Sequence, residues 1–240
     1  MVYVDAHCHL YEFNEHEIKS FLKNTLVAAV SDDLESSMIT IRLSKKYKNI
    51  IPCIGIHPWE ISNASLNDVL ELEKVIIKYG IKCLGEVGLD RKFVPETIDR
   101  QRMFFNEFLR MAREYNLSMN IHSVNTWREV YELLVKNDVE KAVFHWYTGP
   151  LDLIDEIVNA GYYISINPAY RIQEKHRMVV EYVDLDYIVT ESDGPYEYKG
   201  LKLNPLMIDE TLKYIAHVKD LNLNLVKRIV RRNFEKVFST

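Results

Sequence analysis

The chain has 240 residues, a formal net charge of -5 at pH 7 and hydrophobic residues at 48% of its positions. This composition is typical of a folded globular protein, and it excludes a disordered chain and a protein with a global basic field for nucleic acid. The sequence shows no basic, apolar leader and no run of about 20 apolar residues, so we expect a cytoplasmic protein without a membrane span. The three cysteines, which form no CxxC motif, favour a reducing compartment over a disulfide scaffold.

Eight short apolar runs recur along the chain, each rich in β-branched or aromatic residues and followed by polar turn residues. This pattern is typical of strands that are buried on both faces of a parallel sheet. The predicted strands are residues 2–7, 25–30, 50–56, 82–87, 117–122, 141–146, 162–167 and 186–191.

Amphipathic segments separate these runs, with apolar residues at i, i+3 and i+4 and capping residues near several starts. The predicted helices are residues 36–47, 65–79, 98–115, 125–136 and 151–160, followed by two near 205–218 and 224–238. A strand recurs about every 20 to 35 residues, which is the length of a βα unit. We therefore predict an α/β fold, a TIM (β/α)8 barrel that forms one domain over residues 1–240. An open doubly wound sheet is the alternative, but no GxGxxG or P-loop motif follows a strand.

Ionisable residues stand at the ends of the predicted strands, and the carboxyl ends of barrel strands carry the active site. The set consists of His7, His9, His57, Glu86, His122, His145, Glu191 and Asp193. Because side chains alternate along a strand, His7 and His9 share one face and Cys8 points to the other. Imidazoles and carboxylates that converge on the barrel axis fit a pair of divalent cations, with Glu86 as a bridge. A hydroxide shared between two such ions is a strong nucleophile, so the set predicts a hydrolase.

Some polar and aromatic residues are not needed as ligands in this scheme. His57 ends the third strand, where a substrate contact and a structural turn are both open. Glu191 lies two residues before Asp193 on the same face, where it either orients a ligand or is a polar residue of the barrel interior. The aromatic segment RMFFNEFL (102–109) is expected to face the core rather than to stack bases.

Several motifs follow one another in a specific order along the whole chain. They are DAHCHL (5–10), GIHPWE (55–60), GEVGLD (85–90), IHS (121–123), FHWYTG (144–149), ESDGPY (191–196) and NFEKVF (233–238). In these motifs the sequence resembles the TatD-type metal-dependent deoxyribonucleases of the amidohydrolase superfamily.

The resemblance implies two divalent metal ions, drawn from Zn, Mn, Co, Fe and Mg. It implies that His7, His9, Glu86 and Asp193 hold one ion and that Glu86, His122 and His145 hold the other. The implied activity is hydrolysis of DNA phosphodiesters by a hydroxide between the metals, often from the 3′ end of single strands. Glu86 and Asp193 are then the catalytic residues, and Asp193 accepts the proton and returns it to the leaving oxygen. DNA is the expected substrate, bound through local contacts only, and no membrane or obligate protein partner is evident.

The chain departs from the family pattern at two places. Many members carry an arginine two positions after the strand-five histidine, where this chain has Val124. The candidates that replace it as a phosphate contact are Arg91, Lys92, Arg128 and Arg171. The HWYTG motif also differs from the usual residues after its histidine, which makes Tyr147 a candidate substrate contact. A small ester, lactone, amide or nucleotide is the alternative substrate, because a dinuclear centre does not itself select one. A non-catalytic barrel kept for binding is disfavoured by the complete ligand set.

Overall fold

The computed structural model describes residues 2–238, and it contains all eight strands expected from the sequence. The strands are β1 (Tyr3–Cys8), β2 (Thr25–Ala29), β3 (Ile50–Ile54), β4 (Cys83–Asp90), β5 (Ser118–Val124), β6 (Ala142–Phe144), β7 (Tyr163–Ile166) and β8 (Ile188–Thr190). They pair in parallel and in sequence order, from β1 to β8. The prediction of a (β/α)8 barrel is therefore confirmed.

The ring closes between the chain after β8 and the end of β1. The backbone N–H of Asp193 donates to the carbonyl oxygen of His7 at 2.9 Å, and the N–H of His9 donates to the carbonyl oxygen of Gly194 at 2.9 Å. This closure places the chain after β8 beside the end of β1. Residues that are far apart in the sequence therefore lie together at the carboxyl end of the barrel.

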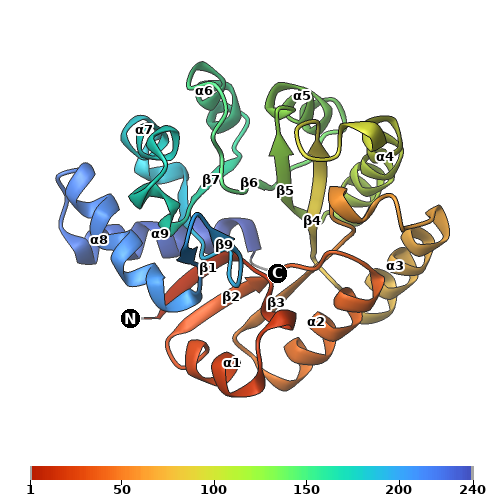
Figure 1. Ribbon diagram of the computed structural model, residues 1–240, viewed down its shortest axis with the longest axis horizontal. Helices are drawn as coiled ribbons and strands as arrows, with labels where there is room; N and C mark the ends of the chain where they lie inside the picture. Colours follow the sequence, from red (N-terminus) through yellow and green to blue (C-terminus); the bar gives the residue numbers. More distant parts are fainter. Residues whose placement is uncertain (1, 239–240) are drawn as a thin grey trace.

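Helices surround the strands on the outside (Figure 1). They are α1 (Glu15–Phe21), α2 (Leu34–Lys46), α3 (Leu66–Tyr79), α4 (Ile98–Tyr115), α5 (Trp127–Lys136), α6 (Asp152–Asn159), α7 (Glu174–Tyr182), α8 (Ile208–Val218) and α9 (Leu223–Phe238). Short 3-10 turns lie at Leu10–Glu12, Pro58–Glu60, Pro95–Thr97, Pro168–Arg171, Leu185–Tyr187 and Pro205–Met207. In the described part of the chain, no helix is long and apolar enough to cross a membrane.

Two helices and one hairpin were not predicted. Helix α1 has seven residues and α7 has nine, and each buries only a few side chains, so neither carries a long apolar period. The hairpin of β9 (Glu197–Tyr198) and β10 (Leu201–Lys202) is shorter still. The predicted core role of segment 102–109 is confirmed, because Phe104, Phe105 and Phe108 of α4 are buried.

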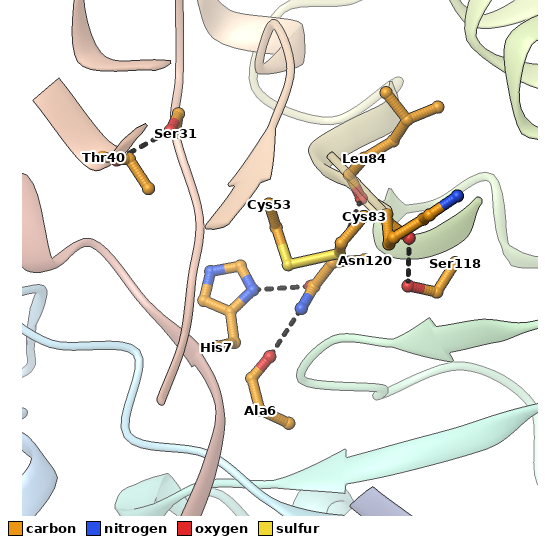
Figure 2. The surroundings of a disulfide bond; sticks show 10 residues. Ala6, His7, Ser31, Thr40, Cys53, Cys83, Leu84, Ser118 and Asn120 are labelled. Carbon is orange, nitrogen blue, oxygen red and sulfur yellow. Dashed lines mark hydrogen bonds between the residues drawn. A yellow bond between two sulfur atoms is a disulfide. The ribbon is translucent and has the colours of Figure 1, made fainter. Parts of the chain in front are cut away.

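The cysteines differ from the expectation. Cys53 of β3 lies opposite Cys83 of β4, and the two form a disulfide across neighbouring strands, with their Cα atoms 4.4 Å apart (Figure 2). The third, Cys8, is free and buried in a small apolar cluster. Sequence spacing could not reveal this pair, because the two residues meet only through strand pairing, at a separation of 30 positions.

Candidate metal centre

The predicted ligands meet at the carboxyl end of the barrel. His7 comes from β1, His9 directly follows that strand, Glu86 comes from β4, His122 comes from β5, His145 follows β6, and Asp193 follows β8. All are buried apart from a small exposed part of the His9 side chain. His9 lies one residue beyond the end of β1, and its imidazole nevertheless faces the same oxygen of Glu86 as that of His7.

Glu86 stands at the centre of the cluster, and its two oxygens face different imidazoles. Its Oε2 lies 3.2 Å from His7 Nε2 and 3.4 Å from His9 Nε2. Its Oε1 lies 2.6 Å from His122 Nδ1 and 4.0 Å from His145 Nε2. One carboxylate therefore connects two pairs of imidazoles.

Asp193 lies on the β1 side of the cluster. Its Oδ1 is 3.5 Å from His7 Nε2 and 3.7 Å from His9 Nε2. Its backbone has a φ of +55°, a left-handed conformation that an aspartate tolerates better than most residues. The hydrogen bond from its N–H to His7 fixes this turn, so barrel closure also positions the carboxylate.

Three of the predicted ligand histidines form a hydrogen bond with the ring nitrogen that faces away from the cluster. The pairs are His7 Nδ1 with Asn120 at 2.8 Å, His122 Nε2 with Asp90 at 3.0 Å and His145 Nδ1 with Glu191 at 2.9 Å. The Nδ1 of His9 lies 3.2 Å from Asp32 Oδ1, at ion-pair distance but without hydrogen-bond geometry. The amide of Asn120 is fixed because its Nδ2 donates to Ala6, so its oxygen faces His7 (Figure 2). Such outer partners set the tautomer and leave the inner nitrogen free to bind a metal.

His57 has the opposite arrangement. Its Nε2 lies 3.1 Å from His122 Nδ1 and 3.3 Å from Glu86 Oε1, so distance alone admits it as a further ligand. However, its Nδ1 accepts the backbone N–H of Trp59 at 3.1 Å. A neutral ring that accepts at Nδ1 carries its hydrogen on Nε2, so His57 faces the cluster as a donor.

Imidazoles stabilise the two buried carboxylates of the cluster, Glu86 and Asp193. Burial raises the pKa of Glu86, but His57, His7 and His145 outweigh this effect and hold that pKa well below its usual range. Burial also raises the pKa of Asp193, and nearby imidazoles only partly offset it. Within residues 2–238, neither carboxylate has a lysine or arginine at ion-pair distance.

The imidazoles respond to the same carboxylates. Burial lowers the pKa of His122, but its hydrogen bonds to Asp90 and Glu86 outweigh burial and raise the pKa to about 9. The pKa of His145 is also raised to about 9, against burial, chiefly by Glu191. Divalent cations bind neutral imidazole and ionised carboxylate, so they would replace these protons. The donor set of imidazoles and carboxylates fits such ions.

The cluster opens into a cavity of about 340 Å³. Its wall carries Val124, at the position where an arginine was expected, and one lysine, Lys92. His57 lines the cavity and also caps the turn Pro58–Glu60 through its Nδ1, so its position is compatible with both predicted roles, substrate contact and structural turn. Aromatic side chains make up much of the remaining wall.

The other predicted substrate contacts do not reach this cavity. The three arginines bind carboxylates elsewhere: Arg91 pairs with Glu129, Arg128 with Glu156 and Arg171 with Glu210. Tyr147 is fully buried, and its hydroxyl donates to the Pro150 carbonyl. The positions of these four side chains therefore do not support their predicted contact with substrate, because each is already engaged away from the cavity wall.

Sequence reasoning missed three of the four residues that orient the ligands. Asn120 lies two residues before His122, so strand alternation would have placed it on the same face. Asp32 follows the second strand, one of the strands for which no metal ligand was predicted. Asp90 closes the GEVGLD motif, but nothing in the sequence shows that β4 continues to that residue.

A ring of eight parallel strands, with imidazoles and carboxylates gathered at its carboxyl end, defines a metal-dependent hydrolase built on a (β/α)8 barrel. A family model described as TatD related DNase matches residues 4–239. An uncharacterized metal-dependent hydrolase of Methanocaldococcus jannaschii is 32% identical, over 98% of this chain and 96% of its own length. The human deoxyribonuclease TATDN3 is 29% identical, over 98% of this chain and 94% of its own.

Solved structures agree with the fold. The crystal structure of YjjV, a TatD homologue of Escherichia coli, has a TM-score of 0.89 at 20% identity and covers 99% of this chain and 98% of its own. A TatD family hydrolase of Entamoeba histolytica has a TM-score of 0.84 at 18% identity, with 100% and 98% covered. The chain belongs to the TatD-related DNase family of metal-dependent hydrolases.

Proposed function

We propose that this protein hydrolyses phosphodiester bonds of DNA with two divalent metal ions bound at the Glu86 cluster. The observation that carries the proposal is the division of imidazoles between the two oxygens of Glu86. A carboxylate that connects two such groups fits a bridging ligand of a dinuclear centre. DNA as the substrate is supported by the family description and by the named activity of human TATDN3.

We assign the predicted ligands to the two ions in two sets that share Glu86. His7, His9, Glu86 and Asp193 would hold one ion, and Glu86, His122 and His145 the other. Imidazole-rich sets of this kind suit Zn²⁺, Mn²⁺, Co²⁺ or Fe²⁺ better than Mg²⁺, which prefers oxygen ligands. When bound, the ions supply Lewis-acid stabilisation of the phosphodiester and activate water for attack.

The side chains have separate tasks around the reacting phosphate. Asp193 accepts a proton at its carboxylate and returns it to the leaving oxygen. The Nε2–H of His57 donates a hydrogen bond to a phosphate oxygen, because its tautomer is fixed from behind by the backbone of Trp59. Lys92 is the cation that lines the cavity and offsets further phosphate charge.

The test is an activity assay on the metal-reloaded protein. Substrates are 3′-labelled single-stranded DNA, duplex DNA and a panel of esters, lactones and amides. We expect metal-dependent release of labelled nucleotide, reduced at least about 100-fold in Asp193→Asn. The matched control is Asp152→Asn, an exposed aspartate in the first turn of α6, which should behave as wild type. DNA cleavage that survives unchanged in Asp193→Asn, or cleavage of small esters alone, would contradict the proposal.

A further inference from the structure

Aromatic side chains line the cavity beside the metal centre in two groups. The first group is Trp59, in the turn after β3, and Phe93, in the loop after β4. Their ring centroids are 5.7 Å apart and their planes meet at 75°. Trp59 is 40% exposed and Phe93 is 56% exposed, although both are large apolar side chains. Exposed aromatic surface on the wall of a functional cavity is a feature of ligand contact.

A single buried carboxylate fixes this first group relative to the metal centre. Asp90 Oδ2 accepts the indole N–H of Trp59 at 2.8 Å and also contacts His122 Nε2. Its Oδ1 accepts the backbone N–H groups of Lys92 and Phe93, both at 2.8 Å. The ligand histidine, the indole and the loop that carries Phe93 are therefore held by the same residue, so the aromatic wall keeps a fixed position beside the centre.

The second group consists of Trp146, Tyr196 and Tyr198. The centroid of the Trp146 indole lies 5.1 Å from that of Tyr198 and 6.0 Å from that of Tyr196, with edge-on geometry in both pairs. Tyr196 is 43% exposed. These rings extend the wall near the end of β6 and the loop after β8.

Another shared carboxylate fixes this second group. Glu191 accepts the backbone N–H of Trp146 at 3.0 Å and contacts His145 Nδ1 at 2.9 Å. The indole N–H of Trp146 donates to Gln173 at 2.7 Å, which fixes the plane of the ring. Each aromatic group is therefore held by a carboxylate that also contacts a predicted ligand histidine.

The charges of the cavity wall do not match an extended nucleic-acid backbone. Lys92 is the sole lysine or arginine among the described lining residues, whereas Glu12, Asp32 and Glu60 add negative charge outside the ligand set. Proteins that bind a run of phosphates neutralise them with several lysines and arginines. A cavity of about 340 Å³ also lies at the small end of ligand pockets.

We infer that the two aromatic groups are stacking platforms for the nucleobases on either side of the scissile phosphate. The Trp59–Phe93 platform holds one base and the Trp146–Tyr196–Tyr198 platform holds the other. The protein therefore recognises its substrate over about two nucleotides, through unpaired bases, with one phosphate at the metal centre. This inference rests on the proposed function and names the contacts by which that substrate is bound.

The first experiment compares planar and non-planar bases. Thymidine dinucleotides are prepared with 5,6-dihydrothymine in either position, which keeps the hydrogen-bonding groups but removes the flat aromatic ring. Wild type should show a KM about 10-fold higher for each modified dinucleotide. Phe93→Leu should lose this preference at one position and Tyr196→Leu at the other, since each variant removes a ring from one platform. Tyr182→Leu, an exposed tyrosine of α7 outside the cavity, is the matched control and should keep both preferences.

The second experiment measures dependence on length and salt. We expect kcat/KM to be nearly equal for a dinucleotide and a 20-nucleotide strand, with a slope of about -1 in log kcat/KM against log salt. Quenching of tryptophan fluorescence by the dinucleotide, measured on metal-free protein, provides a readout that needs no turnover.

The outcomes separate this inference from the proposed function. Failure to cleave any phosphodiester would overturn the proposed function and this inference with it. Cleavage with equal KM for planar and non-planar bases in wild type would overturn the stacking platforms alone. So would a steep gain in kcat/KM with strand length together with a salt slope beyond about -3, because both indicate a phosphate track.

Discussion

At the scale of single residues, the ring nitrogens of histidine decide the roles in the cluster. The position of His7, His9, His122 and His145 could be predicted from strand alternation and from the barrel rule that strand ends carry the site. Their orientation could not, because it depends on side chains from other strands that meet only in the folded chain. Asn120 of β5, for example, contacts His7 of β1, and Asp90 of β4 contacts His122 of β5.

Replacement of Asp90 by asparagine tests the role of an orienting carboxylate. Asp90→Asn weakens the acceptor for His122 Nε2 and for the Trp59 indole, so we expect metal affinity to fall about 10- to 100-fold. The measurement is competition against a chelator of known affinity. Asp152→Asn should bind metal as wild type does, and an unchanged affinity in Asp90→Asn would refute the orienting role.

His176 links stability to pH without touching the ligand set. It is fully buried, accepts the N–H of Asn167 at Nε2, and burial lowers its pKa to about 4. The unfolded chain binds a proton below about pH 6.5, whereas the folded chain resists it until about pH 4. Stability from this residue is therefore complete above about pH 6.5 and is lost as the pH falls toward 4, by about 2 to 3 kcal/mol.

Urea unfolding at about pH 7.5 and about pH 4.5 measures this linkage. We expect the loss of stability between the two values to be about 2 to 3 kcal/mol smaller in His176→Gln than in wild type. Because the two proteins share all other titrating groups, the difference between their losses of stability is the contribution of His176. Equal losses in the two proteins would show that its folded pKa is not depressed.

At the scale of elements, the close approach of β4 and β5 sets the distance between Glu86 and His122. Gly88 lies opposite His122 in the strand register, with a φ of +153°. A Cβ atom at this position would lie 1.9 Å from the His122 carbonyl oxygen. Only glycine lets the two strands approach this closely while they carry two of the predicted metal ligands.

Gly88→Ala is therefore expected to destabilise the fold by at least about 3 kcal/mol, because the clash is with backbone and cannot be relieved by a rotamer change. Gly80→Ala is the control, since Gly80 also has positive φ at the end of α3 but has open space around it. That change should cost only about 1 kcal/mol. Chemical denaturation checks both values, and similar costs at the two sites would contradict the close-approach explanation.

Elements were predictable where their apolar pattern differs clearly from that of the neighbouring chain. The eight strands were found because each lies in a short apolar run bounded by polar residues, although β6 and β8 have only three residues each. The long helices were found because each spans enough residues to show its period, as α4 does over 18 residues. Helix α1 and the β9–β10 hairpin are too short for this. Strand β4 continues to Asp90, beyond its predicted end. The sequence predicts a turn at Gly88, but in the structure this glycine lies within the strand.

At the scale of the whole molecule, long-range pairing decides features that no local pattern shows. The arginines expected at the phosphate were placed correctly near strand ends, but Arg91 and Arg128 bind Glu129 and Glu156 on the outer helices instead. The pairing of Cys53 with Cys83 is of the same kind. Both depend on which neighbours the barrel supplies.

The disulfide gives a direct test at this scale. Unfolded, unreduced protein should show one reactive thiol, that of Cys8, and three after reduction. Because the bridge closes a loop of 30 residues, its reduction is expected to lower the free energy of unfolding by about 3 to 4 kcal/mol. Three reactive thiols before reduction would show that the pair is not bonded in solution.

The proposed dinuclear centre around Glu86 is tested most directly by calorimetric titration of metal-stripped protein with Zn²⁺ and with Mn²⁺. We predict saturable binding of about two ions per chain in wild type. Glu86→Gln should lose at least one of them, because both groups of imidazoles face its carboxylate. Glu140→Gln, an exposed glutamate outside the barrel mouth, should bind as wild type. Absence of saturable binding in wild type, or an unchanged stoichiometry in Glu86→Gln, would contradict a metal centre built on this residue.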